Sequence, residues 1–478
     1  MISRRVETIV LSAVAVTSFM TAFGTSATNL AIPSIGAEFG SNALALSWIV
    51  SSHVLASAAT LVSFGRLADI TGRKRVFLAG TTAFAATSLG CAMASSAQWL
   101  IAARVVQGIS AAMIFSTAMA IVSSVFPPQN RGRALGLTTA ATYTGLSAGP
   151  VLGGFLCQNL GWRSVFLVNV PVCGAAAVLT AVFLKGEWMG APGEKFDAGG
   201  SVLYVTGLTS TLYGLSSLST LWYAKYVLLA GAALLVAFVV YEGRQSHPLV
   251  HIALYSRNLH FSLSNLAAMI NYSATSALTF VLSLHLQVVM GIRSQPAGLI
   301  MLAQPLMMAL VSPSAGVLSD RAEPRIVASA GMAITAAGLF VLSFLLKQAS
   351  IWPIILDLAL IGLGFALFSS PNVNSIMCAV PKKYYGLASS SVATMRVIGQ
   401  GVSMAVVTLL MTMYVGNVDL ASADRTRLVA AGRTAFAVFA ALCALGVVAS
   451  LARGRAHPPE PEAEEETSPG QARAGSDA

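Results

Sequence analysis

Residues 65–75 read Gly-Arg-Leu-Ala-Asp-Ile-Thr-Gly-Arg-Lys-Arg and separate two long apolar stretches, at 44–64 and 76–96. Each stretch has about the 20 residues that an α-helix needs to cross a hydrocarbon core of about 30 Å. Basic residues between two such stretches are typical of a short loop on the cytoplasmic side of a membrane. The segment therefore predicts two membrane-spanning helices joined by a basic cytoplasmic loop.

Apolar stretches of this kind recur along the whole chain. Hydrophobic residues make up 56% of the sequence and charged residues only 10%, against about 25% charged residues in a soluble domain. Barrel strands alternate in polarity over about ten residues, and these stretches do not. We therefore predict an all-α polytopic membrane protein, with twelve spans as the alternative to fourteen. The fourteen predicted spans are 8–32, 44–64, 76–96, 99–125, 134–157, 164–184, 199–218, 225–241, 262–289, 296–315, 326–346, 351–371, 386–415 and 433–452.

The basic residues predict the orientation of these helices. With the N-terminus inside, most of the 28 Lys and Arg residues fall in cytoplasmic segments, as the positive-inside rule requires. An even number of spans then places both termini in the cytoplasm. The same asymmetry accounts for the net charge of +10 without a nucleic-acid partner. The predicted location is the cell membrane, with the lipid bilayer as the surroundings of the helices.

Two polar interruptions, at 185–198 and 242–261, divide the spans into six, two and six. The predicted units are an N-terminal six-helix half (1–185), two inserted helices (186–260) and a C-terminal six-helix half (261–455). A tail at 456–478, rich in Pro, Glu and Ala, is predicted to be disordered.

The two six-helix halves share a sequence feature at the same position. Gly65 to Asp69 closes the second span with the pattern G-x-L-x-D, and Gly316 to Asp320 closes the second span of the later half with the same pattern. We expect both to lie on cytoplasmic loops. Duplication of this kind is typical of transporters in which two halves move about a binding site near the middle of the membrane.

The basic loop also suggests a gate. Gly65 and Gly72 allow helices to approach closely, Asp69 precedes the positive N-terminus of the next helix, and Arg73 can pair with an acid across the loop. We expect these contacts to hold the inner end of the protein shut until its charges shift.

Residues 65–75 resemble the signature of the major facilitator superfamily, and other motifs resemble its fourteen-helix drug:proton antiporter branch. Two such motifs are similar to patterns of that branch: the first to R-x-x-Q-G, and the second to G-x-x-x-G-P-x-x-G-G. These motifs contain Arg104, Gln107 and Gly108 in the fourth span, and Gly145, Gly149, Pro150, Gly153 and Gly154 in the fifth. The resemblance covers roughly residues 10–450. It implies a major facilitator fold of two six-helix halves plus two extra helices, which exports small organic compounds against proton entry and is not an enzyme.

Arg104 has two interpretations. An arginine deep in a span is costly unless it faces a wet cavity or a partner, so Arg104 can couple proton movement to transport, as the resemblance implies. Alternatively, its five N–H groups brace neighbouring helices through backbone carbonyls. In the fifth span, Pro150 removes a backbone hydrogen bond and its glycines permit close packing, so we expect this helix to bend against a neighbour.

The sequence departs from the branch in its first span, where Gly24 stands in place of the usual aspartate. A proton-coupled transporter needs a group that titrates within the membrane, and Asp357 is the acid that falls clearly within a predicted span. Its alternative role is that of an ordinary acid near a helix N-terminus, reached by outer water. His53 and His285 are the other titratable candidates in the spans.

Polar and aromatic residues on otherwise apolar helices predict a binding cavity for an amphipathic or lipophilic compound. The candidates are Ser26, Asn29, His53, Tyr143, Gln287 and Asn372, and helix packing is the competing role for each. We expect no metal and no cofactor other than the proton gradient. A uniporter or importer on the same fold, and a membrane receptor that does not transport, remain as alternatives.

Overall fold

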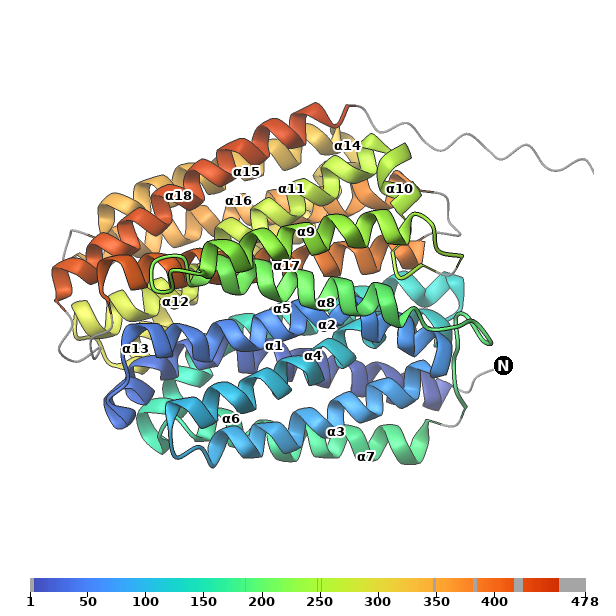
Figure 1. Cartoon of the computed structure of the whole chain (residues 1–478), viewed down its shortest axis with the longest axis horizontal. Helices are drawn as coiled ribbons and strands as arrows, with labels where there is room; N and C mark the ends of the chain where they lie inside the picture. Colours follow the sequence, from blue (N-terminus) through green and yellow to red (C-terminus); the bar gives the residue numbers. More distant parts are fainter. Residues whose placement is uncertain are drawn as a thin grey trace, which may run out of the picture.

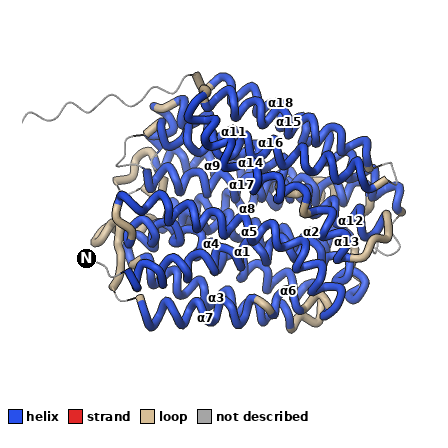
Figure 2. Tube along the Cα trace, turned by 180° about the vertical axis from the view of Figure 1, so that it is seen from behind, coloured by secondary structure: helices blue, strands red, loops and turns tan. Residues whose placement is uncertain are grey.

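The computed structural model describes residues 4–184, 186–246, 248–250, 252–346, 350–380, 385–416 and 424–454. In these ranges every regular element is a helix, and most of the helices run roughly along one direction of the molecule (Figures 1 and 2). Long apolar helices form because their backbone groups pair within the helix and need no water. The predicted all-α fold is confirmed.

The first helices pack into one bundle. Side chains cap two of them at their starts: Asn42 accepts from the Ala45 amide at 2.7 Å, and Ser96 accepts from the Trp99 amide at 3.2 Å. These helices are α1 (Arg4–Phe39), α2 (Ala43–Thr71), α3 (Arg73–Ala92), α4 (Ala97–Val125), α5 (Pro128–Leu160), α6 (Ser164–Leu167) and α7 (Asn169–Phe183).

Two helices, α8 (Ala198–Ser216) and α9 (Ala224–Glu242), follow as an adjacent pair (Figure 1). Helix α8 contacts α2, because Ser201 donates to the Ser63 hydroxyl at 2.7 Å and Tyr204 donates to the Ala58 carbonyl at 3.3 Å. Helix α9 exposes apolar side chains such as Leu229 and Val236. Exposed apolar residues on a helix of this length are what a lipid environment requires.

The remaining helices form a second bundle, and two of the predicted spans are divided there. The stretch 262–289 forms α11, α12 and a π-helical turn, η1, while 296–315 falls on α13 and α14. The elements are α10 (Ile252–Arg257), α11 (Leu259–Thr275), α12 (Leu278–Leu284), η1 (His285–Val289), α13 (Ser294–Met301), α14 (Ala303–Arg321), α15 (Pro324–Leu345), α16 (Ile351–Cys378), α17 (Tyr385–Tyr414) and α18 (Arg425–Ala452).

Eleven helical segments of the described chain are long and apolar enough to cross a membrane. The predicted spans at 76–96, 134–157 and 199–218 fall on α3, α5 and α8, which are not among the eleven. These helices are 20, 33 and 19 residues long, but they are rich in Gly, Ser and Thr. The count of fourteen spans therefore stays a prediction.

The expectation that Gly65 to Asp69 lies in a loop is wrong. Helix α2 continues to Thr71, and only Gly72, with a φ of +124°, separates it from α3. Helix α14 likewise continues through Gly316 to Arg321. Neither segment contains a proline, and a single glycine inside a helix costs only about 1 kcal/mol, so the backbone stays helical where the side chains turn polar.

The start of α1, the end of α18 and the connection between α2 and α3 lie at the same end of the bundle (Figure 1). We call it the Gly72 end, and the opposite end, where α1 finishes and α2 begins, the Gly40 end. The predicted division at residues 185, 260 and 455 stays a prediction, and the predicted tail at 456–478 lies outside the described residues.

Candidate functional site

A cavity lies between the two bundles, and its space, including the part open to solvent, is about 1,080 Å³. On one side it is lined by α1, α2 and α5, and on the other by α11, α12, α13, α14, α16 and α17. Three predicted binding residues line it: Ser26, Asn29 and Tyr143. Its walls mix apolar side chains with hydroxyl and amide groups, which is typical of sites for small organic molecules.

The other predicted binding residues do not line this cavity and have packing contacts instead. Gln287 donates to the Leu30 carbonyl at 3.2 Å, and Asn372 donates to the Ser264 carbonyl at 3.1 Å. His53 is buried, and its carbonyl oxygen lies against Gly108 of α4. The role of these residues in binding stays a prediction.

Among the described residues that line the cavity, Arg396 of α17 is the one charged side chain. Its guanidinium carbon lies 5.2 Å from the ring centre of Tyr272 and 5.9 Å from that of Tyr143. Because Tyr143 belongs to α5, Arg396 meets a ring from each bundle. Sequence reasoning did not place Arg396 in the binding site, because nothing local shows which face of its helix meets the cavity.

The two bundles touch at the Gly40 end of the cavity. Ser283 of α12 donates to the Asn29 carbonyl of α1 at 2.6 Å. The hydroxyls of Ser51 on α2 and Thr408 on α17 lie 3.1 Å apart. Asn29 and Ser51 lie level with the lining residues of α1 and α2. Thr408 lies one turn beyond the last lining residue of α17, toward the Gly40 end. These contacts therefore hold the bundles together on that side of the cavity.

The glycines of α5 bring backbones together at this closed end. A Cβ atom on Gly153 would lie 2.6 Å from the Ala27 Cβ of α1, and one on Gly154 would lie 2.5 Å from the Ser294 carbonyl oxygen. The reciprocal contact is closer still, because a Cβ on Gly298 of α13 would lie 1.9 Å from the Pro150 carbonyl oxygen. Helix α5 runs through Pro150 uninterrupted. The motif therefore packs α5 against both bundles.

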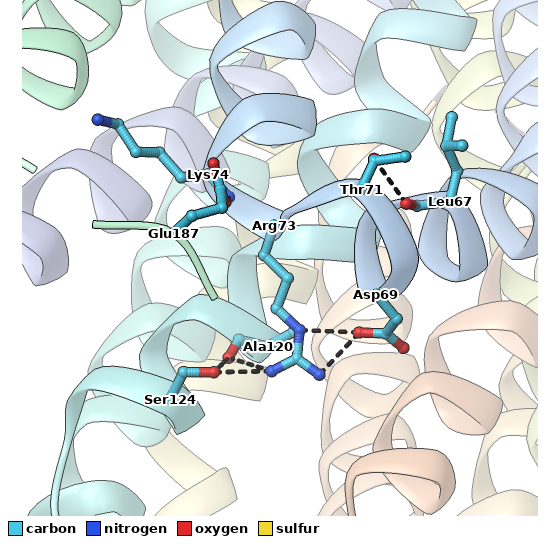
Figure 3. Close-up of polar contacts among 8 residues, drawn as sticks. All are labelled: Leu67, Asp69, Thr71, Arg73, Lys74, Ala120, Ser124 and Glu187. Atoms are coloured by element: carbon cyan, nitrogen blue, oxygen red, sulfur yellow. Dashed lines mark hydrogen bonds and ion pairs between the residues drawn. The ribbon is translucent and has the colours of Figure 1, made fainter. Parts of the chain in front are cut away.

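At the Gly72 end, Arg73 connects α3 to α2 and α4. Its guanidinium donates to the Asp69 carboxylate at 2.8 Å, to the Ser124 hydroxyl at 2.7 Å and to the Ala120 carbonyl at 3.3 Å (Figure 3). Three helices of the same bundle therefore meet on one side chain. The predicted pairing of Arg73 with an acid is present, and its partner is Asp69, four residues earlier in the chain.

The segment 186–197 crosses this motif as a strap, which sequence reasoning missed. The Glu187 carboxylate accepts from the Lys74 amide at 2.7 Å, and Glu194 pairs with Arg66. The Gly190 and Ala191 amides both donate to the Asp69 carbonyl at 3.0 Å. The opposite charges of the two segments are a signal in the sequence, but 112 residues separate Arg75 from Glu187.

Replacing Glu187 by alanine should destabilise the strap. The carboxylate accepts from the first turn of α3, and loss of a helix cap costs about 1 kcal/mol. We expect thermal unfolding in detergent to shift down by a few degrees, and Glu187→Gln to recover part of the loss because an amide oxygen still accepts. Lys195→Ala, on an exposed residue of the same strap, is the control. Equal effects of Glu187→Ala and Lys195→Ala would contradict a capping role.

Arg104 is 1% exposed and lies among α2, α3 and α4. It donates to the Ile49 carbonyl at 3.1 Å and to the Gln107 side chain at 2.6 Å, and Gln107 donates to the Ser88 hydroxyl at 2.8 Å. Arg104 is absent from the cavity lining. These contacts are those of a brace between helices, and a coupling role stays a prediction.

The predicted proton site lies away from the cavity lining. Asp357 on α16 is 5% exposed, and neither carboxylate oxygen has a hydrogen-bond partner among the described residues. It faces α15, since a Cβ on Gly338 would lie 3.5 Å from one of those oxygens. At Gly24, where the branch has an acid, a Cβ would point at Asn169 of α7, 3.5 Å away. His285 is likewise buried, without a partner for either ring nitrogen among the described residues.

The two helical bundles enclose an amphipathic cavity and touch at its Gly40 end, and they meet again on the Gly72 side, where the hydroxyls of Tyr143 on α5 and Ser369 on α16 lie 3.3 Å apart. This arrangement is that of a polytopic membrane transporter. Solved structures share the fold: a peptide transporter POT in complex with sulfate has a TM-score of 0.70 and 13% identity, covering 94% of this chain and 96% of that one. A POT family transporter in complex with 5-aminolevulinic acid has a TM-score of 0.68 and 14% identity, covering 92% and 95%.

The sequence model of the Major Facilitator Superfamily matches residues 14–270 and 264–476. Multidrug resistance protein Stp of Mycobacterium tuberculosis is 32% identical over 84% of this chain and 75% of its own length. Cephamycin export protein CmcT of Amycolatopsis lactamdurans is 35% identical over 81% and 82%. Riboflavin transporter RibZ of Clostridioides difficile is 27% identical over 93% and 96%. The chain belongs to the major facilitator superfamily, and the names of several relatives describe multidrug resistance or antibiotic export.

Proposed function

We propose that this transporter exports small organic compounds from the cytoplasm by alternating access, in exchange for protons. The observation that carries the proposal is the cavity between the bundles. At its Gly40 end the bundles are joined by close contact between the backbones of α5 and α13. A site of this kind can serve both sides of a membrane if the contacts at its two ends form in turn.

The predicted orientation gives this conformer a place in the cycle. If the Gly72 end is cytoplasmic, the Gly40 end faces outward, and the packing of α5 on α13 closes this conformer to the outside. The outward-facing state then requires the contacts between α5 and α13 to separate. In the proposal, the strap and Arg73 keep α2, α3 and α4 together as one body during that movement.

Asp357 is the proposed proton carrier. An ionised carboxylate without a partner is costly in a buried site. Binding and release of a proton at Asp357 therefore change the stability of this conformer. The neighbouring contact with α15, through Gly338, offers a way for that change to reach a helix interface. The proposal follows from the position of the acid, since Gly24 removes the usual acid of the first span.

The test is a transport assay in everted membrane vesicles that are acidified inside. If the protein is a proton antiporter, adding a transported compound to the outside releases protons from the vesicles. It also drives accumulation of the compound against its gradient. Accumulation that never exceeds equilibrium would show a uniporter, and release of preloaded compound from the vesicles together with the protons would show an importer. Binding without any flux would favour a receptor.

Replacing Asp357 by asparagine should abolish coupling to the proton gradient without abolishing movement of the substrate across the membrane. We expect pH-driven accumulation to be lost while exchange of labelled for unlabelled substrate across the membrane continues, because the cavity lining is unchanged. Asp357→Glu keeps the titratable group and should retain part of the pH-driven transport. Undiminished accumulation by Asp357→Asn would remove Asp357 from the mechanism.

A further inference from the structure

We propose that the cavity selects flat aromatic organic anions, with the guanidinium of Arg396 as the group that binds the anionic substituent. This inference rests on the proposed function, because it treats the cavity as the transport site. It adds a substrate class that the fold alone does not specify.

The first argument is the charge of the cavity. Arg396 lies on its wall, and no Asp or Glu is present among the described lining residues. The Nε atom of Arg396 is buried and lacks a hydrogen-bond partner in the described chain. Arg396 as a whole is half-buried, and a carboxylate or sulfonate would supply the counter-charge that the described lining lacks. Arginine suits such groups because its planar fork can donate two parallel hydrogen bonds.

The second argument is the set of rings beside Arg396. Tyr272 and Tyr143 lie within 6 Å of the guanidinium, and the Tyr272 ring packs edge-on against Phe365 with ring centres 5.5 Å apart. All three rings line the cavity. A flat aromatic compound bound at Arg396 therefore meets aromatic faces and edges next to its charged substituent.

The third argument is the adaptable part of the cavity lining. Three methionines from three different helices, Met301, Met308 and Met404, line the same cavity. Thioether side chains are flexible and pack favourably against aromatic rings of varied outline. Gln304 and Gln400 add amide groups that can pair with ring oxygens. The cavity lining therefore selects for the negative charge and the flat shape of the substrate, and it tolerates different substituents on the substrate's ring system.

Three charged side chains that are more deeply buried than Arg396 lie elsewhere in the described chain. Arg104 is held by Ile49 and Gln107, Arg453 donates to Asn372 at 2.6 Å, and Asp357 faces α15. None of the three lines the cavity. The sign of the cavity charge therefore depends on Arg396.

Two dyes with the same three-ring xanthene skeleton and opposite charge test the proposal. Fluorescein is an anion at pH 8, and rhodamine 123 is a cation. Binding of each to the purified full-length protein in detergent can be followed by fluorescence anisotropy. We expect the unmodified protein to bind fluorescein about tenfold more tightly or better, because a hydrogen-bonded charge pair contributes about 1.5–3 kcal/mol. Tighter binding of rhodamine 123 would overturn the proposal.

Arg396→Gln removes the charge and keeps a hydrogen-bonding side chain. We expect it to weaken fluorescein binding by about tenfold or more, and to leave rhodamine 123 binding unchanged or stronger. Arg396→Lys should retain the preference for the anion. Arg75→Gln removes a charge from the exposed α3 terminus and is the control for net charge. Equal loss of both dyes in Arg396→Gln would assign Arg396 to holding the bundles together and would contradict charge selection.

Transport assays keep this proposal separate from the proposed function. If everted vesicles accumulate neither dye, the export proposal fails for these compounds, while the binding comparison still decides the selection of charge. If Arg396→Gln exchanges the preferred dye from fluorescein to rhodamine 123 and still responds to the pH gradient, both proposals are supported.

Discussion

Replacing Gly298 by alanine should prevent the two bundles from closing at the Gly40 end. The new Cβ atom would lie 1.9 Å from the Pro150 carbonyl oxygen, and a backbone atom in a helix cannot move aside as a flexible side chain can. Overpacking of this kind costs about 1–3 kcal/mol or more, which shifts a two-state equilibrium about 5- to 150-fold away from this conformer. We expect transport to fall by a similar factor, because the cycle then lacks one of its two states.

Spin labels can follow this shift directly. Leu160 at the end of α5 and Arg293 just before α13 are both exposed, and they flank the contact between the Gln295 amide and the Gln158 side chain. We expect Gly298→Ala to populate a longer distance between labels at 160 and 293. Gly90→Ala is the matched control, because a Cβ atom there meets nothing within 4 Å. An unchanged distance distribution together with normal transport would show that this packing does not close the cavity.

Replacing Arg104 by alanine should destabilise the N-terminal bundle and abolish transport. The change leaves the Ile49 carbonyl and the Gln107 side chain without their buried partner. Each unsatisfied group costs about 1–3 kcal/mol, so we expect a loss of about 2–6 kcal/mol in the free energy of unfolding. Thermal unfolding in detergent measures the loss, and a transport assay on the same samples measures function.

Lysine at position 104 distinguishes the brace from the coupling role. A brace needs the forked hydrogen bonds of a guanidinium, so Arg104→Lys should remain unstable and inactive even though it keeps the positive charge. A coupling cation would instead recover pH-driven transport in Arg104→Lys. An Arg104→Ala protein with unchanged stability, intact substrate exchange and no pH-driven transport would contradict the brace and support coupling.

Particular residues show where sequence reasoning succeeded and where it stopped. The pattern at Gly149, Gly153 and Gly154 predicted close helix packing, and these glycines do bring α5 against α1 and α13. The identity of α13 as a partner was not predictable, because more than a hundred residues separate the two helices. The end of α2 was predicted too early, since polarity was read as a loop while the backbone stays helical to Thr71.

The candidate site shows the same division. Ser26, Asn29 and Tyr143 were predicted to bind because they are polar or aromatic residues on apolar helices, and they line the cavity. Gln287 and Asn372 satisfied the same criterion, yet their amides pair with neighbouring backbones. The contact between Arg396 and Tyr272 arises only because α11 packs on α17, which the sequence does not show.

The sequence by itself determined the helical class, the family and most of the helix-packing motifs, because hydrophobic length and small-residue spacing act locally along the chain. Only the tertiary structure decided which polar side chains meet the cavity, which acids pair with the basic motif and which end of the cavity the bundles close. Those outcomes depend on the rotation of each helix about its axis and on contacts between residues far apart in the chain. A single sequence records neither of them.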